Sequence, residues 1–148
     1  MPNMFTWMVL FLLFFGVPAR AFEIKFDLDE WSQKKGDHFV VYYTQQSQEQ
    51  DAGEILRHAE EDYERILDRI GAKKVDNFWT WDDRVKIVYY PDAQSFVKAT
   101  GQPSWSKGVS LSHASNFQMR LIVSFQGQDD FLEAVLPHEI SHLVMHDF

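Results

Sequence analysis

The spacing of apolar and polar residues along the chain predicts an alternation of strands and helices. Between residues 49 and 70, apolar side chains recur every three or four positions, which predicts one long helix that Gly71 ends. A shorter helix is predicted over 92–100, and a final helix from Asp129 or Asp130 to the end of the chain. Runs rich in β-branched and aromatic residues predict strands over 22–28, 38–44, 84–90, 109–115 and 118–125. This order favours a single α+β domain.

The acidic residues of the long predicted helix fall mostly outside its apolar stripe. They are Glu54, Glu60, Glu61, Asp62, Glu64 and Asp68. Acidic residues in this arrangement are typical of a solvated helix face, so we do not interpret them as a binding site.

The N-terminal segment has the pattern of a signal peptide. Residues 5–17 form an apolar run that is shorter than the roughly 20 residues a membrane helix needs. Ala19 and Ala21 match a signal-peptidase site, which predicts cleavage before Phe22 and export of residues 22–148 to the periplasm or the extracellular space. After cleavage no stable membrane span is expected. Because no Lys or Arg precedes the apolar run, an uncleaved anchor is the alternative.

Composition excludes several classes of function. The chain has 14 Lys and Arg against 22 Asp and Glu, a formal net charge of −8, whereas a nucleic-acid-binding protein needs a basic surface. Cysteine is absent, which excludes disulfides, thiol catalysis, iron–sulfur clusters and cysteine-based zinc sites.

One motif carries specific chemistry: residues 138–142 read His-Glu-Ile-Ser-His. On a helix, His138 and His142 lie one turn apart on one face, where both imidazoles can bind the same zinc ion. Glu139 then lies beside the metal, placed to take a proton from a bound water molecule. The uncharged neighbours Leu136 and Leu143 indicate that the other side of this helix is buried.

The segments around this motif resemble the peptidase MA-like family of the gluzincin zinc metallopeptidases. Residues 136–144 are similar to the active-site helix of that family, and residues 38–43, 63–72, 84–96 and 101–103 are similar to segments that precede it. The resemblance implies a zincin-like N-terminal subdomain: a mixed or antiparallel sheet of about four or five strands, a long helix and a C-terminal active-site helix.

The same resemblance implies roles for individual residues. His138 and His142 correspond to zinc ligands and Glu139 to the general base that helps to hydrolyse a peptide or protein substrate. Residues 120–125 correspond to the strand that pairs with the substrate backbone.

The third zinc ligand of that family is a Glu on a further helix, and no such helix follows here. The sequence ends at Phe148, six residues after His142. We therefore expect residues 22–148 to be the N-terminal portion of such a domain, without its C-terminal subdomain. His146 and Asp147 are poorly placed on the same straight helix to replace that ligand.

The histidines outside the motif, and Pro137 directly before it, have other possible roles. His113 is a long-range candidate for a ligand or a substrate contact, whereas His38 and His58 are interpreted as structural or surface residues. Pro137 leaves two alternatives: it opens a separate active-site helix, or one longer helix kinks at this position.

Two functions are therefore open, and a null hypothesis stands beside them. The first is a secreted zinc metallopeptidase domain, inactive if the third ligand is missing. The second is a non-catalytic exported module that keeps the fold and binds a peptide or partner through Trp79, Trp81 and Trp105, which we otherwise expect in the core or at a hinge. The null hypothesis is an acidic exported domain in which the motif is accidental.

Overall fold

The computed structural model describes residues 27–72, 79–112 and 120–147. Its strands and main helices follow one another in the order β1 (Ser32–Lys35), β2 (Phe39–Tyr43), α1 (Glu49–Ile70), β3 (Val85–Tyr90), α2 (Ala93–Thr100), β4 (Gly108–Ser112), β5 (Arg120–Phe125) and α3 (Leu136–Asp147). The predicted α+β class is confirmed, and so are the helices at 49–70 and 92–100 and the strands near 38–44, 84–90, 109–115 and 118–125. The predicted leader (1–21) and His113 lie outside the described residues.

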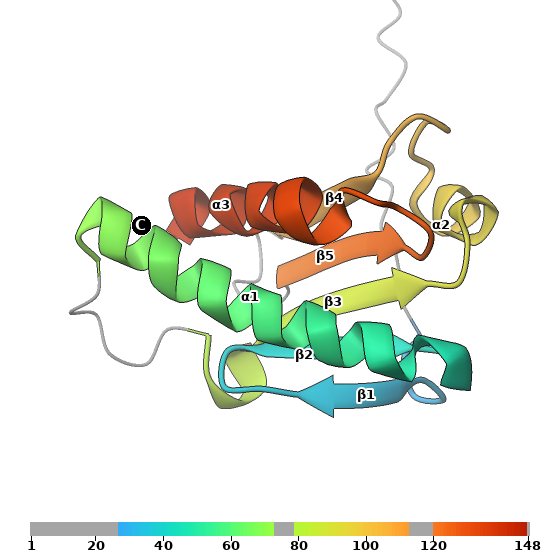
Figure 1. Ribbon diagram of the computed structural model, residues 1–148, viewed down its shortest axis with the longest axis horizontal. Helices are drawn as coiled ribbons and strands as arrows, with labels where there is room; N and C mark the ends of the chain where they lie inside the picture. Colours follow the sequence, from blue (N-terminus) through green and yellow to red (C-terminus); the bar gives the residue numbers. More distant parts are fainter. Residues whose placement is uncertain (1–26, 73–78, 113–119, 148) are drawn as a thin grey trace, which may run out of the picture.

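The strands form one mixed sheet of five in the order β1-β2-β3-β5-β4. The central strands β2, β3 and β5 are parallel, and β1 and β4 pair antiparallel with them at the two edges. Val41, Ile87 and Ile122 are neighbours across the three central strands and are fully buried. Figure 1 shows α1 and α3 side by side over one face of this sheet.

The first strand differs from the prediction. A strand was expected over 22–28, but residues 27 and 28 are not in a strand, and residues 22–26 lie outside the described part. The first described strand is β1, whose sequence Ser-Gln-Lys-Lys has no apolar residue. Because β1 is an edge strand with mostly exposed side chains, the apolar alternation that reveals strands is absent there.

α1 covers the sheet with the apolar stripe that its periodicity predicts. Ile55, Ala59, Tyr63 and Leu67 are buried in the main core beneath it. Gly71 ends the helix with φ +76°, and its N–H donates to the carbonyls of the last turn. A side chain is disfavoured in that left-handed conformation, so the glycine is needed at this position.

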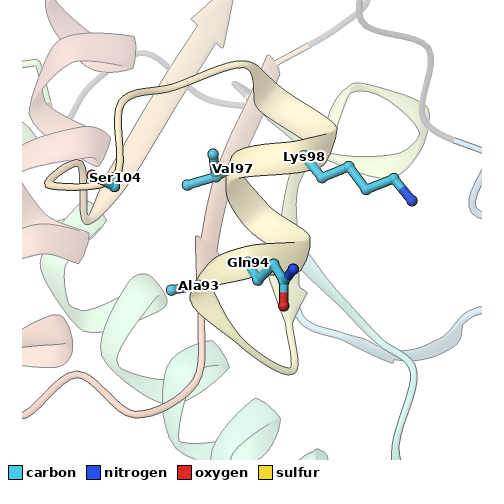
Figure 2. Close-up of a pocket in the computed structure, with 5 residues that line it drawn as sticks. All are labelled: Ala93, Gln94, Val97, Lys98 and Ser104. Carbon is cyan, nitrogen blue, oxygen red and sulfur yellow. The ribbon is translucent and has the colours of Figure 1, made fainter.

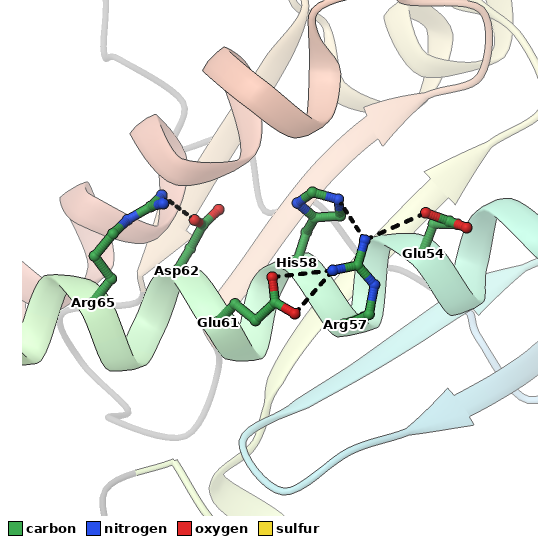
Figure 3. Close-up of polar contacts among 6 residues, drawn as sticks. All are labelled: Glu54, Arg57, His58, Glu61, Asp62 and Arg65. Atoms are coloured by element: carbon green, nitrogen blue, oxygen red, sulfur yellow. Dashed lines mark hydrogen bonds and ion pairs between the residues drawn. The ribbon is translucent and has the colours of Figure 1, made fainter.

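The acidic side of α1 is only partly solvated. Glu54 and Glu61 are exposed and pair with Arg57, as predicted (Figure 3). Glu60 instead binds the start of β2: its Oε1 accepts from the backbone N–H groups of His38, at 2.9 Å, and Phe39, at 3.2 Å. Its Oε2 lies 2.7 Å from His38 Nδ1, which confirms the structural role expected of that histidine.

Asp62 is the second exception on α1. Its side chain is 5% exposed and pairs with Arg65 through Oδ1, while Oδ2 has no hydrogen-bond partner (Figure 3). Burial raises the pKa of this carboxyl above its ordinary value, although Arg65 acts in the opposite direction. The solvated-face interpretation is therefore wrong for Glu60 and Asp62.

α2 packs on the opposite face of the sheet. Asp92 caps it by accepting from the Ser95 N–H at 2.8 Å, and Gly101 ends it with φ +68°. Phe96 is fully buried with Val88, Leu121 and Val123. A shallow depression of about 460 Å³ lies beside this helix. It is lined by Ala93, Gln94, Val97, Lys98 and Ser104 (Figure 2).

The helical segment that leads into α3 shows how Pro137 is accommodated. A π-helical turn, η3 (Phe131–Val135), runs directly into α3, with the Val135 N–H donating to Asp130 O at 3.3 Å. Pro137 is the second residue of α3. Because η3 and α3 are continuous, Pro137 lies just inside the α-helical part of one longer helical segment and does not open a separate helix, so the first alternative is wrong.

No helix in the described ranges combines the length and the apolar character that crossing a membrane requires.

The buried carboxyl of Asp62 yields a prediction about pH. Because its pKa is raised in the folded state, its charge lowers the free energy of unfolding at neutral pH, and this penalty disappears as protonation proceeds at lower pH. Asp62→Asn should therefore be more stable than the wild type at pH 7, and the difference should narrow toward pH 4. Urea unfolding at both pH values measures it, with the exposed Glu64→Gln as control. If Asp62→Asn is less stable than the wild type at pH 7, the charged Asp62 carboxylate does not destabilise the fold.

Candidate metal centre

The two histidines of the motif meet on the exposed side of α3. Nε2 of His138 lies 2.9 Å from Nε2 of His142, and the two rings are perpendicular, with their centroids 4.4 Å apart. Both residues are exposed, whereas Leu136, Ile140, Leu143 and Val144 on the other side of the helix are buried, as the sequence predicts. The buried side fixes the helix against the sheet and α1, and the histidines are thereby presented to solvent.

This pair fits two positions of a zinc coordination sphere. Two ring nitrogens bound tetrahedrally to one zinc at about 2.0–2.1 Å lie roughly 3.3–3.4 Å apart. The 2.9 Å between the two nitrogens is close to that value. A small rotation of either exposed ring is sufficient to reach it, and no change in the helix backbone is required.

Glu139 differs from the histidines because it is buried. It is 8% exposed and lies on the side of α3 that faces β4. With His138 it lines a cavity of about 310 Å³ whose other lining residues are Trp105, Ser106, Lys107, Gly108, Ala134 and Val135. The acid that the motif predicts to be a base therefore shares one open cavity with a candidate metal ligand.

Gly108 sets the distance between β4 and α3. A Cβ atom on this residue would lie 2.9 Å from Val135 Cγ1 and 3.7 Å from Glu139 Cγ. The first distance is too short for any real side chain unless Val135 moves. The absence of a side chain is therefore what allows the strand to run directly beside Glu139.

The strand at the open edge is β4, which corrects one expectation. Residues 120–125 were expected to pair with the substrate, but they form β5, which is hydrogen-bonded to β3 on one side and to β4 on the other. β5 has no free edge to offer. Within the described sheet, β4 pairs only with β5, so its other edge is open. Gly108, the first residue of β4, lines the cavity.

No third ligand joins the pair within the described residues. Nowhere in ranges 27–72, 79–112 and 120–147 do three or more His, Cys, Asp or Glu side chains gather in a metal-binding arrangement. His58 lies beside Arg57, with their nitrogens 2.8 Å apart, on α1. His113, the long-range candidate for a third ligand, lies outside the described residues, so its role stays a prediction.

Asp147 has a structural role that the sequence did not reveal. Its carboxylate accepts from Trp79 Nε1 at 2.8 Å and pairs with Arg120 on β5, and its side chain is 7% exposed. Burial acts to raise its pKa, but hydrogen bonds from Trp79, His146 and Arg120 outweigh burial and hold the pKa below its ordinary value. Asp147 therefore joins the end of α3 to the sheet, and His146 is engaged with it at 3.1 Å.

The three loop tryptophans do not share one environment. Trp79 is 1% exposed and stacks on Tyr63, which confirms core packing for this residue. Trp81 and Trp105 are 81% and 82% exposed, so core packing is wrong for both. Only Trp105 lies at the cavity.

No protein-family model matches the chain, and no curated protein matches it at a significant level.

The close contact at Gly108 yields a paired prediction. Gly108→Ala forces Val135 away from β4, so the free energy of unfolding should fall by about 1–3 kcal/mol. Gly53→Ala on α1 is the matched control: its Cβ meets only the Lys34 side chain at 4.0 Å, and alanine should stabilise the helix by about 0.5–1 kcal/mol. Thermal and urea unfolding of both variants measure the difference. Equal effects of the two substitutions would show that β4 is not closely packed against Val135 of η3.

Proposed function

We propose that this chain is an exported zinc metallopeptidase domain of the peptidase MA-like type. The observation that carries the proposal is the placement of three residues on α3: ring nitrogens of His138 and His142 lie 2.9 Å apart, and the buried Glu139 lines one cavity together with His138. The similarity of residues 136–144, and of the segments that precede them, to the peptidase MA-like family supports this assignment. The apolar run of residues 5–17 and the Ala19-x-Ala21 site support export.

Each residue has a distinct task in this proposal. His138 and His142 would hold a zinc ion through their imidazole nitrogens, and the metal would supply Lewis-acid activation of a water molecule. Glu139 takes a proton from the attacking water and passes it to the amine nitrogen that leaves when the peptide bond breaks. Glu139 is 8% exposed and lines the cavity, so it is partly shielded from bulk water while facing the space that a substrate would enter.

The outer edge of β4 is the proposed substrate-binding strand. Its sequence Gly-Val-Ser-Leu-Ser carries no charge and no proline, so nothing in it prevents another strand from pairing. An extended peptide that adds to this edge by backbone hydrogen bonds lies along the cavity that Glu139 lines.

A second candidate function uses the same strand without hydrolysis. It is favoured by the lack of a third metal-binding side chain near the two histidines in the described residues, since catalytic zinc normally has three protein ligands. In that case the domain binds extended peptides on β4 and does not cleave them.

The experiment is digestion of an unfolded protein substrate by the full chain with added zinc, followed by mass spectrometry. We expect fragments that a chelator suppresses and that Glu139→Gln reduces by about 10²–10⁴-fold, because the general base is lost. Glu133→Gln, an exposed acid on the preceding π-helical turn, is the matched control and should leave the fragments unchanged.

Two results would contradict the peptidase proposal. One is cleavage that Glu139→Gln does not alter. The other is binding of peptide to β4 without any cleavage in the presence of zinc, which would establish the second candidate function.

A further inference from the structure

The cavity beside Glu139 has a wall that peptide hydrolysis does not use. This wall comes from the loop between α2 and β4 on one side and from η3 on the other, and it contributes Trp105, Ala134 and Val135. Hydrolysis requires only His138, His142, Glu139 and the edge of β4. The wall is therefore free to select which side chain enters beside the cleaved bond.

Trp105 is the unusual residue of this wall. Its side chain is among the largest apolar groups of the chain, yet the residue is 82% exposed. The loop that carries it is ordered by local contacts: the Ser106 N–H donates to Pro103 O at 2.9 Å, and Ser106 itself is buried. An indole held in water on a fixed turn, at the mouth of a cavity, offers an apolar face that a ligand can cover.

The polar groups of the wall are already paired. Ser106 Oγ donates to Gly108 O at 3.1 Å, and Lys107 Nζ lies 2.5 Å from Asp130 Oδ2. The carbonyl of Lys107 accepts from Ser124 Oγ at 2.7 Å and from Gln128 Nε2 at 3.0 Å. What the wall leaves for an incoming side chain is thus the indole of Trp105 and the methyl groups of Ala134 and Val135.

We propose that this cavity is a specificity pocket for an aromatic side chain of the peptide, which packs against Trp105. The inference rests on the proposed function for the position of the cleaved bond, but the pocket itself is defined by the wall. An aromatic ring gains most from an indole face and from small apolar neighbours. An alanine side chain is too small to cover the indole, so it is the contrasting probe.

Binding of blocked amino acids tests the pocket without any need for hydrolysis. Saturation-transfer NMR with the full chain should detect N-acetyl-phenylalaninamide and give little signal with N-acetyl-alaninamide. Trp105→Ala should weaken binding of the phenylalanine probe by about threefold to tenfold. Trp81→Ala is the matched control: it removes an equally exposed tryptophan, at 81%, that does not line the cavity, and should bind as the wild type does.

The results separate this proposal from the proposed function. Binding of the aromatic probe that depends on Trp105 supports the pocket even if no peptide is cleaved, in which case only the peptidase proposal fails. If peptides are cleaved, an aromatic residue should predominate at one position beside the cut, and Trp105→Ala should abolish that preference. Equal binding of the two probes, or cleavage without an aromatic preference, would overturn the proposed pocket.

Discussion

The close packing of α3 against β4 at Gly108 is the contact on which the candidate site depends. It brings the edge of the sheet next to Glu139, and no side chain larger than hydrogen fits there without moving Val135. The opposite end of α3 is held by Asp147, which pairs with Arg120 and accepts from Trp79. A helix fixed at both ends keeps His138, His142 and Glu139 in a constant position relative to the strand that would carry a substrate.

The two sides of α3 have different roles because one side is buried and the other is exposed. Leu136, Ile140, Leu143 and Val144 are buried between the sheet and α1, which holds the helix by the hydrophobic effect. The two histidines project to the open side, where a metal ion can reach them. Glu139 lies at the boundary between the two sides, so it is buried yet borders the cavity. That boundary position suits a base that must reach substrate while being shielded from bulk water.

Local signals allowed much of this fold to be predicted. The periodicity of α1, the caps Asp92 and Gly101, and the β-branched runs of β2, β3 and β5 depend on near neighbours in the chain. The motif itself depends on the spacing of residues along one helix. By contrast, β1 has no apolar pattern because it is an exposed edge strand. The substrate-pairing strand was expected at residues 120–125, which form an inner strand, because strand order depends on contacts between distant segments. The structural roles of Glu60, Asp62 and Asp147 were not predicted for the same reason. Their hydrogen-bond partners, or the groups that bury them, belong to elements that are distant in the sequence.

The central claim is that His138 and His142 bind one zinc ion together. Calorimetric titration of the full chain with zinc tests it most directly, with His142→Ala beside the wild type and His58→Ala as a control histidine on α1. The account predicts one zinc per chain for the wild type and for His58→Ala, and at least about tenfold weaker binding for His142→Ala, since one of the two protein ligands is lost. Zinc binding that is absent from the wild type, or unchanged in His142→Ala, would contradict it.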